Sequence, residues 1–393
     1  FIPQEASMTL TTSKAVGSKI GLSMLSKYAG STGEQRLKVW IDLNNNRKED
    51  AGELVNSDLS YVEYTIQSQT VTIYGPVVNF SCYGNQLTSL DVTRNAVLES
   101  LYCYENLLTS LDVSNLPSLE YLGCHDNSLT TLNVSGATML RSITCHNNQL
   151  VTVNTGNLTK LEMFRCANNR ITSLDMTRNE YLTTLDCERN QLVTLDVSKN
   201  KKLMRLTCTD NQLTTLNTSN IPALTWLSCG NNRLTSLMLN NPALKELSCQ
   251  NNQLGSFNII PSTALTFLNC ARNNLTTLVI SHNTALTYLY CAFNQLTTLD
   301  ASSNRALPAL NCSFNQLVSL VVSDQGVIKS IDCESNRLRG TAITELITSL
   351  PDRTGENAGT VDFGLTFEGD VAGENNFTRT DEQNARKKNW YLY

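Results

Sequence analysis

Apolar and polar residues alternate along most of this chain in a pattern that repeats about every 21 residues. From residue 77 to residue 338, each period reads L-x-x-L-x-C-x-x-N-x-L, with other apolar residues at some of the Leu places. The alternation in L-x-C is that of a β-strand, so we expect Leu and Cys to point inward and the residues between them to point outward. Units that repeat at a fixed period stack and bury a common core. The pattern therefore predicts a solenoid with one long parallel sheet.

The 13 cysteines of the chain all belong to this period. Successive cysteines lie 21 residues apart, except for the interval of 20 between Cys229 and Cys249. Adjacent parallel strands are ~4.8 Å apart, whereas a disulfide needs Cβ atoms about 3.8 Å apart. No C-x-x-C pair occurs, and such pairs are the usual sign of a zinc site. We therefore predict 13 reduced thiols in one buried column.

An Asn stands three residues after every cysteine, where the chain must leave the sheet. We expect its amide to hydrogen-bond the backbone of its own and neighbouring turns. The second half of each period reads L-T-x-L-D-V-S-x-N, as in residues 87–95, and is too short for a full α-helix. It predicts short extended segments and tight turns. The repeated acids of this half are predicted to hydrogen-bond nearby backbone; they are Asp91, Asp112, Asp175, Asp196 and Asp300.

The eleven-residue signature resembles that of the leucine-rich-repeat family over about residues 77–338. The 21-residue length and the cysteine column resemble the internalin-like, cysteine-ladder type found on bacterial (Bacteroides-type) cell surfaces. The resemblance implies a leucine-rich-repeat solenoid, a curved right-handed β/α superhelix that is mostly parallel β, here with 13 turns. It also implies a non-enzymatic adhesion module that is extracellular or at the cell surface, with a lipid anchor attached through an N-terminal signal removed before Phe1 as one arrangement.

Both ends of the chain depart from the repeat and are expected to cover its open edges. Residues 1–76 alternate in strand fashion at 8–12, 37–43, 62–66 and 70–74 and predict a β-rich cap domain. Residues 77–338 form the solenoid, and residues 339–393 predict a small α/β cap. In that second cap, Ile343, Leu346, Ile347 and Leu350 have helical spacing before Pro351, a second helix is expected with Thr380 as its N-cap, and residues 389–393 suit a last strand.

One loop of the first cap, residues 42–53, has the oxygen spacing of an EF-hand-type calcium site. The candidate ligands are Asp42, Asn44, Asn46, Asp50 and Glu53. Arg47 occupies the place where that motif has Gly, and no helices flank the loop. The sequence favours a plain hydrophilic hairpin loop and leaves calcium as the alternative; no other cofactor is expected.

The composition of the chain limits the classes of partner that we expect. The formal net charge is −5 and only 17% of residues are charged, so the chain has no basic field for nucleic acid. No run of 18 apolar residues occurs, so no membrane span is expected. We recognise no paired carboxylates, no Ser-His-Asp set and no Gly-rich phosphate loop in the sequence. The sequence therefore predicts a protein that is not an enzyme. We expect a monomer.

The outward places of the repeat are free to vary, so we expect function there, on the concave face of the sheet. These places lie three before, one before and one after each Cys, and several hold aromatic residues or Arg, which are typical of binding hot spots. The candidate ligand-binding residues are Tyr83, Tyr102, Tyr104, Tyr121, His125, His146, Arg165, Arg205, Trp226, Phe267, Tyr288 and Tyr290. We expect a protein ligand, with a surface glycan stacked on the same rings as the alternative. Cross-strand packing that only stabilises the sheet is expected to account for about half of these aromatics.

Two of the three histidines, His125 and His146, follow successive cysteines and should lie side by side on the outer face. They could be two ligands of a metal ion. Asp126 is the nearest carboxylate and there is no third His nearby, so the ligand set is sparse. The sequence favours ordinary surface histidines.

Overall fold

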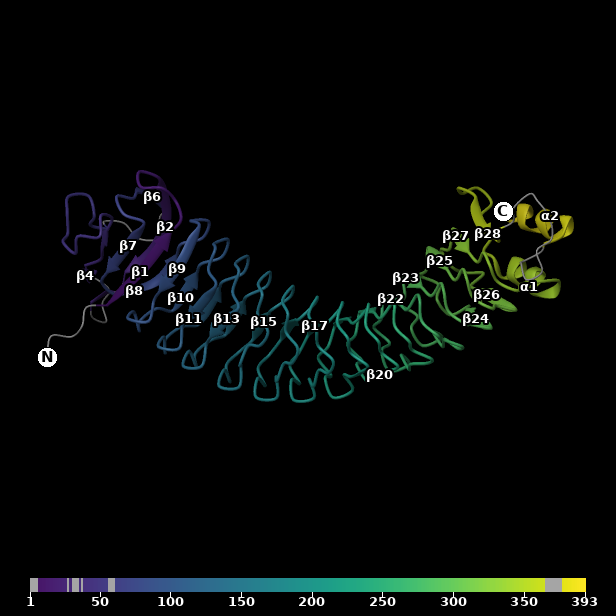
Figure 1. Ribbon diagram of the computed structural model, residues 1–393. Coiled ribbons are helices and arrows are strands. Elements are labelled where there is room, and N and C mark those ends of the chain that lie inside the picture. The colour runs from purple at the N-terminus through teal and green to yellow at the C-terminus, as the bar shows by residue number, and fades with distance from the viewer. Residues whose placement is uncertain (1–5, 27, 30–34, 37, 56–60, 365–376) are drawn as a thin grey trace. The chain divides into compact units, whose positions relative to one another are not determined.

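The computed structural model describes residues 6–26, 28–29, 35–36, 38–55, 61–364 and 377–393. The chain divides into two compact units, Phe1–Leu195 and Asp196–Tyr393, which we describe in turn. Within each unit, short strands of successive turns lie side by side (Figure 1).

The first unit begins with antiparallel strands. They are β1 (Ser7–Thr12), β2 (Lys19–Ser26), β3 (Tyr28–Ala29), β4 (Gln35–Arg36), β5 (Trp40–Asp42), β6 (Val62–Thr65) and β7 (Thr70–Tyr74). Strand β7 lies between β5 and β1. Strands are found where the sequence predicts them at β1, β6 and β7, whereas β5 is shorter than the expected strand at 37–43, of which residue 37 lies outside the described residues.

Strand β2 is the element of this cap that our sequence interpretation missed, although Ile20, Leu22 and Met24 alternate inward and are buried. It pairs with β6 and, through Met24 opposite Phe80, with β8 (Val77–Ser81), the first strand of the repeat. The cap therefore covers the open edge of the first turn.

The repeat strands of the first unit form a parallel ladder. After β8 come β10 (Ser100–Tyr102), β12 (Tyr121–Gly123), β14 (Ser142–Thr144), β15 (Met163–Arg165) and β16 (Thr184–Asp186). Equivalent residues of successive turns pair, as in Leu101 with Leu122. On the return side lie β9 (Leu87–Asp91), β11 (Ser110–Asp112) and β13 (Thr131–Asn133). Strand β9 pairs with β1, which extends the cap over the return side.

The second unit continues the same design. Its parallel ladder contains β17 (Arg205–Thr207), β19 (Trp226–Ser228), β21 (Glu246–Ser248), β22 (Phe267–Asn269), β23 (Tyr288–Tyr290), β25 (Ala309–Asn311) and β27 (Ser330–Asp332). Its return strands are β18 (Thr215–Asn217), β20 (Ser236–Met238), β24 (Thr298–Ala301) and β26 (Ser319–Val322). Trp226 pairs with Glu246, so the shorter interval of 20 residues between Cys229 and Cys249 does not disturb the ladder. The expected short extended return segments are confirmed.

Every cysteine of the chain is a free thiol and is completely buried, as predicted. Each one directly follows a ladder strand and points inward beside the buried apolar residue two places before it, such as Leu101 beside Cys103. Loss of solvation raises the thiol pKa of Cys103, Cys145 and Cys291 to about 12. These thiols therefore stay protonated and act as small apolar side chains.

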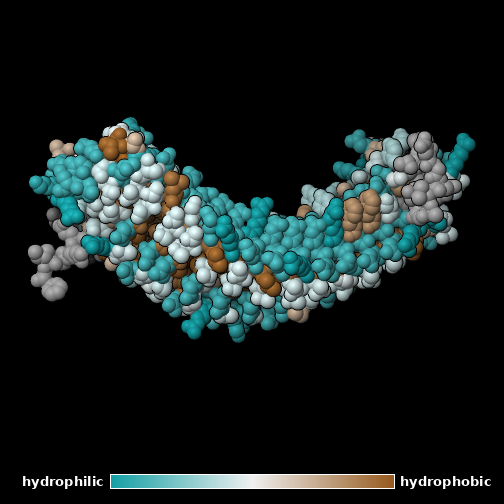
Figure 2. Space-filling view, in the orientation of Figure 1, coloured by the Kyte–Doolittle hydropathy of each residue, from teal (hydrophilic) through white to brown (hydrophobic). Residues whose placement is uncertain are grey.

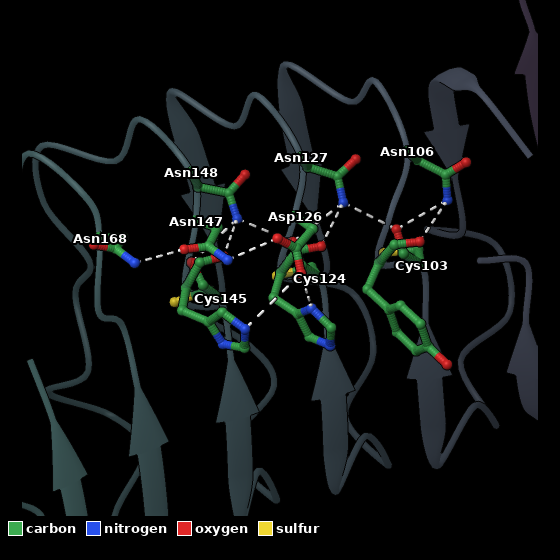
Figure 3. A network of polar contacts seen from close by, with 12 residues as sticks. Cys103, Asn106, Cys124, Asp126, Asn127, Cys145, Asn147, Asn148 and Asn168 are labelled. Atoms are coloured by element: carbon green, nitrogen blue, oxygen red, sulfur yellow. Dashed lines mark hydrogen bonds and ion pairs between the residues drawn. The ribbon is translucent and has the colours of Figure 1, made fainter. Parts of the chain in front are cut away.

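The asparagine three places after each cysteine joins neighbouring turns, and Asn127 is typical (Figure 3). Its amide nitrogen donates to the carbonyl oxygens of Cys103 at 3.0 Å and Cys124 at 3.2 Å. It also donates to the carbonyl of His125 at 3.2 Å, while the amide N–H of Leu108 donates to its Oδ1 at 3.0 Å. The side chain is thus used in full to satisfy backbone groups at the end of each strand.

The first asparagine of the column, Asn85, has no preceding turn, and the cap supplies the missing partners. Gly21 of β2 donates its N–H to Asn85 Oδ1 at 2.9 Å, and its carbonyl oxygen accepts from Asn85 Nδ2 at 2.7 Å. Thr12 of β1 donates its hydroxyl to the carbonyl of Asn85 at 2.7 Å. The cap thus imitates a repeat at the level of hydrogen bonds.

The repeated aspartates of the return side also hydrogen-bond the backbone, as predicted. In each one, Oδ1 accepts the N–H of the residue two places later, as in Asp91 with Thr93 at 3.0 Å and Asp300 with Ser302 at 2.9 Å. The same bond is made by Asp112, Asp175 and Asp196.

The C-terminal cap extends the ladder by two strands, β28 (Gly359–Asp362) and β29 (Trp390–Leu392), so a last strand forms as expected. Helix α1 (Thr341–Ser349) ends before Pro351 and packs against β26. Helix α2 (Arg379–Lys387) starts earlier than predicted: its N-cap is Thr378 and not Thr380, because Asp381 completes a capping box with Thr378. Neither α1 nor α2 has the length and apolar character required to cross a membrane.

Candidate functional site

The outward side chains of the ladder form a continuous surface within each unit, which we call the strand face. It comprises the places three before, one before and one after each cysteine, where every sequence-predicted ligand-binding residue lies. The side chains of the predicted ligand-binding residues are exposed or half-buried, whereas the intervening Leu and Cys residues are buried. In the view of Figure 2 the molecular surface is mostly hydrophilic or neutral, with hydrophobic side chains in small separate spots. The outward places of the strand face themselves hold mainly aromatic, polar and small residues, so aromatic rings and not a broad aliphatic patch distinguish this face.

Four rings at the place after the cysteine stack along the first unit, and we call them the aromatic stack. It consists of Tyr83, Tyr104, His125 and His146. Successive ring centroids are 4.8, 4.5 and 4.4 Å apart, and the ring planes differ by no more than 9°. This spacing follows from the distance between parallel strands. Such contacts stabilise the sheet, so these four residues have a structural role whatever else they do.

Beside the aromatic stack the strand face is hollowed, which sequence reasoning did not predict. The hollow has a volume of about 540 Å³ and is lined by Ser81, Tyr102, Tyr104, Tyr121, Leu122, Gly123, His125, Ser142 and Thr144. Gly123 occupies the place before Cys124, between Tyr102 and Thr144 of the flanking strands. The absence of a side chain at Gly123 leaves space over the sheet. Tyr102 leans over this space, since a Cβ at Gly123 would lie 3.0 Å from Tyr102 Cδ1.

The remaining candidates of the first unit lie close to this region. Arg165 is exposed and pairs in register with Thr144 on one side and Asp186 on the other. Thr144 lines the hollow, so Arg165 is a predicted ligand-binding residue that lies one strand away from the hollow. The structure thus brings Tyr102, Tyr121 and the aromatic stack together, with Arg165 at the edge of the group.

The second unit carries its own candidates. The Arg205 guanidinium lies over the Trp226 ring, 4.1 Å from its centroid. Phe267 contacts the rings of both Tyr288 and Tyr290, with centroids 6.0 Å apart in each case. Tyr288 and Tyr290 remain 53% and 44% exposed, comparable to Tyr102 and Tyr121 in the first unit. These side chains form a second aromatic group.

At one end of the aromatic stack, His125 and His146 meet the carboxylate of Asp126. His125 Nδ1 is 2.7 Å and His146 Nε2 is 3.9 Å from Asp126 Oδ2. Burial lowers the pKa of His146 below its ordinary value, and the neighbouring His125 lowers it further. His146 therefore favours the neutral form. Spacing along the sequence placed the histidines together but did not indicate that Asp126 turns back toward both.

Asp126 turns toward both histidines because of a backbone conformation that the sequence interpretation missed. The residue two places after each cysteine, from Glu105 to Ser335, has φ between 50° and 57°, in the left-handed region. In the first turn this place is Gly84, with φ 67°. Asn and Asp, which tolerate this region best, occupy it in several turns, including Asp126 and Asn147, and that enrichment is the sequence signal.

The calcium candidate loop, residues 42–53, is closed by its own side chains. The carboxylate of Asp42 accepts the N–H groups of Asn46 at 3.0 Å and Arg47 at 2.8 Å. Glu53 accepts those of Leu43 and Asp50, both at 2.8 Å. Arg47 adopts φ 63°, so it makes the left-handed turn for which the calcium motif normally uses Gly. Asp42 and Glu53 are buried, which is unusual for carboxylates, and these backbone donors satisfy their oxygen atoms.

Comparison with known proteins supports the fold. No family model matches the chain, and no curated protein does. Among solved structures, the functional domain of InlJ from Listeria monocytogenes, which includes a cysteine ladder, is 26% identical with a TM-score of 0.58. That match covers 73% of this chain and 74% of the other. A leucine-rich-repeat protein of Leptospira interrogans is 22% identical with a TM-score of 0.61 and covers 80% and 83%.

An internalin, InlF of Listeria monocytogenes, is 18% identical with a TM-score of 0.56 over 70% of this chain and 85% of that one. At these identities the second and third likenesses concern the fold alone. Together with the parallel ladder of 21-residue turns, they show that this chain is a leucine-rich-repeat solenoid, here with a buried cysteine column.

Proposed function

We propose that this protein is a non-enzymatic binding module that acts outside the cell or at its surface and recognises a protein ligand through the strand face. The observation that carries the proposal is the hollow at Gly123. Rigid aromatic side chains around a concavity give large contact area at little loss of side-chain entropy, and such residues dominate the energy of protein interfaces. A volume of about 540 Å³ accommodates one or two side chains of a partner.

Within this region Tyr102 and Tyr121 are the best candidates for direct contacts. Neither belongs to the aromatic stack, and they are 39% and 42% exposed. The core beneath them is already filled by Leu101, Leu122 and the cysteines. Because the fold does not require these two rings, their presence on an exposed, hollowed surface favours a role in binding.

A surface glycan is the second candidate ligand, and a specific observation favours it. Ser81, Ser142 and Thr144 line the same hollow as the tyrosines. Where hydroxyl groups lie beside flat aromatic faces, the hydroxyl groups can hydrogen-bond a sugar while the aromatic faces stack on its ring. The two candidates would use the same residues, so they must be separated by experiment.

The test compares two double variants. The full chain is measured against a panel of purified surface-protein ectodomains and against a glycan array, and each hit is repeated with Tyr102→Ala/Tyr121→Ala. Loss of both rings should weaken binding by about 2 kcal/mol or more if they are hot-spot residues. Tyr288→Ala/Tyr290→Ala is the matched control, because it removes two rings of similar exposure from the second unit.

The expected result is reduced affinity for the first pair only, with the melting temperatures of both variants close to that of the parent. A saturable hit on ectodomains supports the protein ligand, and a hit on glycans alone supports the second candidate. If verified binding is unaffected by the first pair and lost with the second, the binding site lies in the second unit. Location is tested separately, by fractionating source cells and by protease treatment of intact cells.

A further inference from the structure

The cluster at the end of the aromatic stack unites three side chains that can bind a metal ion: His125, Asp126 and His146. Their ligand atoms all lie within 4.8 Å of one another. The side chains are 22%, 38% and 31% exposed, so they are accessible to an ion and still partly sheltered. This is the one group of three such residues found in the described part of the chain.

The repeat itself builds the cluster. His125 and His146 occupy equivalent places of successive turns, which sets their ring centroids 4.4 Å apart. Asp126 has the left-handed φ of 53° that directs its side chain back along the strand face. Asn147 then donates to Asp126 Oδ1 at 2.7 Å, and Asn168 donates to Asn147 Oδ1 at 2.8 Å (Figure 3). These bonds orient the carboxylate so that Oδ2 faces the histidines.

We propose that His125, Asp126 and His146 bind one divalent transition-metal ion of the zinc, copper or nickel class. A tetrahedral ion with ligands at about 2.1 Å holds its ligand atoms about 3.4 Å apart. The separations of 2.7 and 3.9 Å from Asp126 Oδ2 bracket that value. Rotation of side chains, without movement of the backbone, therefore brings the three groups to bonding distance, and water fills the fourth position.

The ring orientation adds a specific expectation. The two imidazoles are parallel to within 7°, so their in-plane nitrogen lone pairs do not converge. One ring must rotate about its Cβ–Cγ bond to ligate the ion. Binding thus opens the stacked contact between His125 and His146, and the Asp126 carboxylate changes from a hydrogen-bond acceptor of His125 to a metal ligand.

The ligand set also selects the class of ion. Two imidazole nitrogens and one carboxylate oxygen suit zinc, copper and nickel, whereas calcium and magnesium require more oxygen ligands. The cysteines do not compete in the folded protein, because all of them are completely buried. The third histidine, His282, belongs to the second unit, where it is exposed on the return side.

The test is a zinc titration of the full, untagged chain by calorimetry. Millimolar calcium is present throughout, so that the oxygen-rich loop at residues 42–53 does not take up zinc. The variants are His125→Gln/His146→Gln, Asp126→Asn and Asn147→Ala, with His282→Gln as the matched control. Melting temperatures establish that each variant is folded.

We expect one zinc ion per chain. Loss of the ligating residues should weaken zinc binding at least about tenfold. Asn147 only orients Asp126, so Asn147→Ala should weaken binding about tenfold. His282→Gln should have no effect. Copper added to the parent should give an electron paramagnetic resonance spectrum with coupling to two imidazole nitrogens. Absence of saturable zinc binding by the parent, or equal affinity in the double histidine variant, would overturn the proposal.

Discussion

At the scale of single residues, the most demanding places are those two after each cysteine. Their left-handed backbone costs an ordinary L-residue about 1–2 kcal/mol, and Asn or Asp less. Several turns nevertheless hold larger residues there, such as Glu105, Arg189 and Phe314. In two successive turns the side chains compensate by contact, because the Phe293 and Phe314 rings stack with centroids 4.4 Å apart. The periodic cysteines are evident from sequence, whereas the Asn and Asp signal for this backbone angle is weak, because Glu, Arg and Phe occupy the same place in other turns.

The first prediction uses this strain. Glu105→Asn should stabilise the protein by up to about 1 kcal/mol, because Asn tolerates the left-handed region better than Glu. Urea unfolding measures the difference. Glu99→Asn is the control, since Glu99 is exposed, directly precedes β10 and lies outside the left-handed region. An equal effect at both positions would show that the gain comes from composition and not from backbone strain.

The second prediction concerns the asparagine column. Asn127→Ala leaves the N–H of Leu108 without its side-chain acceptor, and it removes one of the two side-chain donors to the carbonyl of Cys103, the other being Asn106. An unsatisfied buried N–H costs about 1–3 kcal/mol and an ordinary lost hydrogen bond about 1 kcal/mol, so we expect a total loss of about 3 kcal/mol. Asn168→Gly, which changes an exposed residue of the neighbouring column and suits its φ of 52°, should cost well under half as much in the same unfolding measurement. Equal losses would contradict a special role for the column.

At the scale of elements, sequence was a reliable guide where periodicity is strong. The ladder strands, the short return strands and α1 lie where the pattern predicts them. It failed where two signals compete: Thr378 and Thr380 both precede the acids of α2, and only the capping box with Asp381 decides between them. Strand β2 was not predicted, although its apolar residues alternate as they do in the cap strands that were.

The third prediction follows from the Asp381 cap. Burial alone would raise the pKa of Asp381, but hydrogen bonds from Thr378 and from the Thr344 hydroxyl of α1 lower it below its ordinary value. A carboxyl with a lowered folded pKa stabilises the fold above its unfolded pKa of about 3.9, and this contribution is lost as the pH falls through the folded value. Asp381→Asn should therefore melt at a lower temperature than the parent at pH 7, with the gap narrowing toward pH 3.

Glu345→Gln, which changes an exposed carboxylate of α1, is the control for that experiment. Its melting temperature should follow that of the parent at every pH. A gap between Asp381→Asn and the parent that stays constant from pH 7 to pH 3 would mean that the cap does not depend on the charge of Asp381.

The fourth prediction concerns the loop at residues 42–53, which we propose as a calcium site. Its carboxylates now accept backbone N–H groups, and Asn44 and Asn46 both donate to Asp50 Oδ2 at 2.7 Å. A bound ion would replace these amide donors with metal–oxygen bonds and stabilise the folded chain by mass action. Millimolar calcium should therefore raise the melting temperature of the parent and not that of Asp50→Asn.

Arg47→Gly offers a second arm of the calcium experiment. It gives the sixth place of the loop the residue that best adopts φ 63°, so it should be at least as responsive to calcium as the parent. If neither the parent nor Arg47→Gly shifts in melting temperature, the loop is an ordinary hydrogen-bonded hairpin.

At the scale of the whole molecule, the sequence located the surface on which binding residues gather but not its relief. The outward places follow directly from the L-x-C alternation. The hollow depends on the missing side chain of Gly123 and on the direction in which Tyr102 leans, which a one-dimensional pattern does not contain. The same limit applies to Asp126, whose approach to both histidines requires the left-handed backbone.

The last prediction treats the cysteines as reporters of unfolding along the chain. All 13 are free and buried, so a native sample should take up no alkylating reagent and a fully denatured, unreduced sample should take up 13. A repeat contacts only its neighbours, so partial unfolding in intermediate urea must expose consecutive turns. Mass mapping of partly alkylated molecules should then find modified cysteines in unbroken runs, because a turn cannot open alone between two closed ones without exposing both of their core faces. A single modified cysteine flanked by protected ones in most molecules would contradict this behaviour, and missing pairs after denaturation would indicate disulfides.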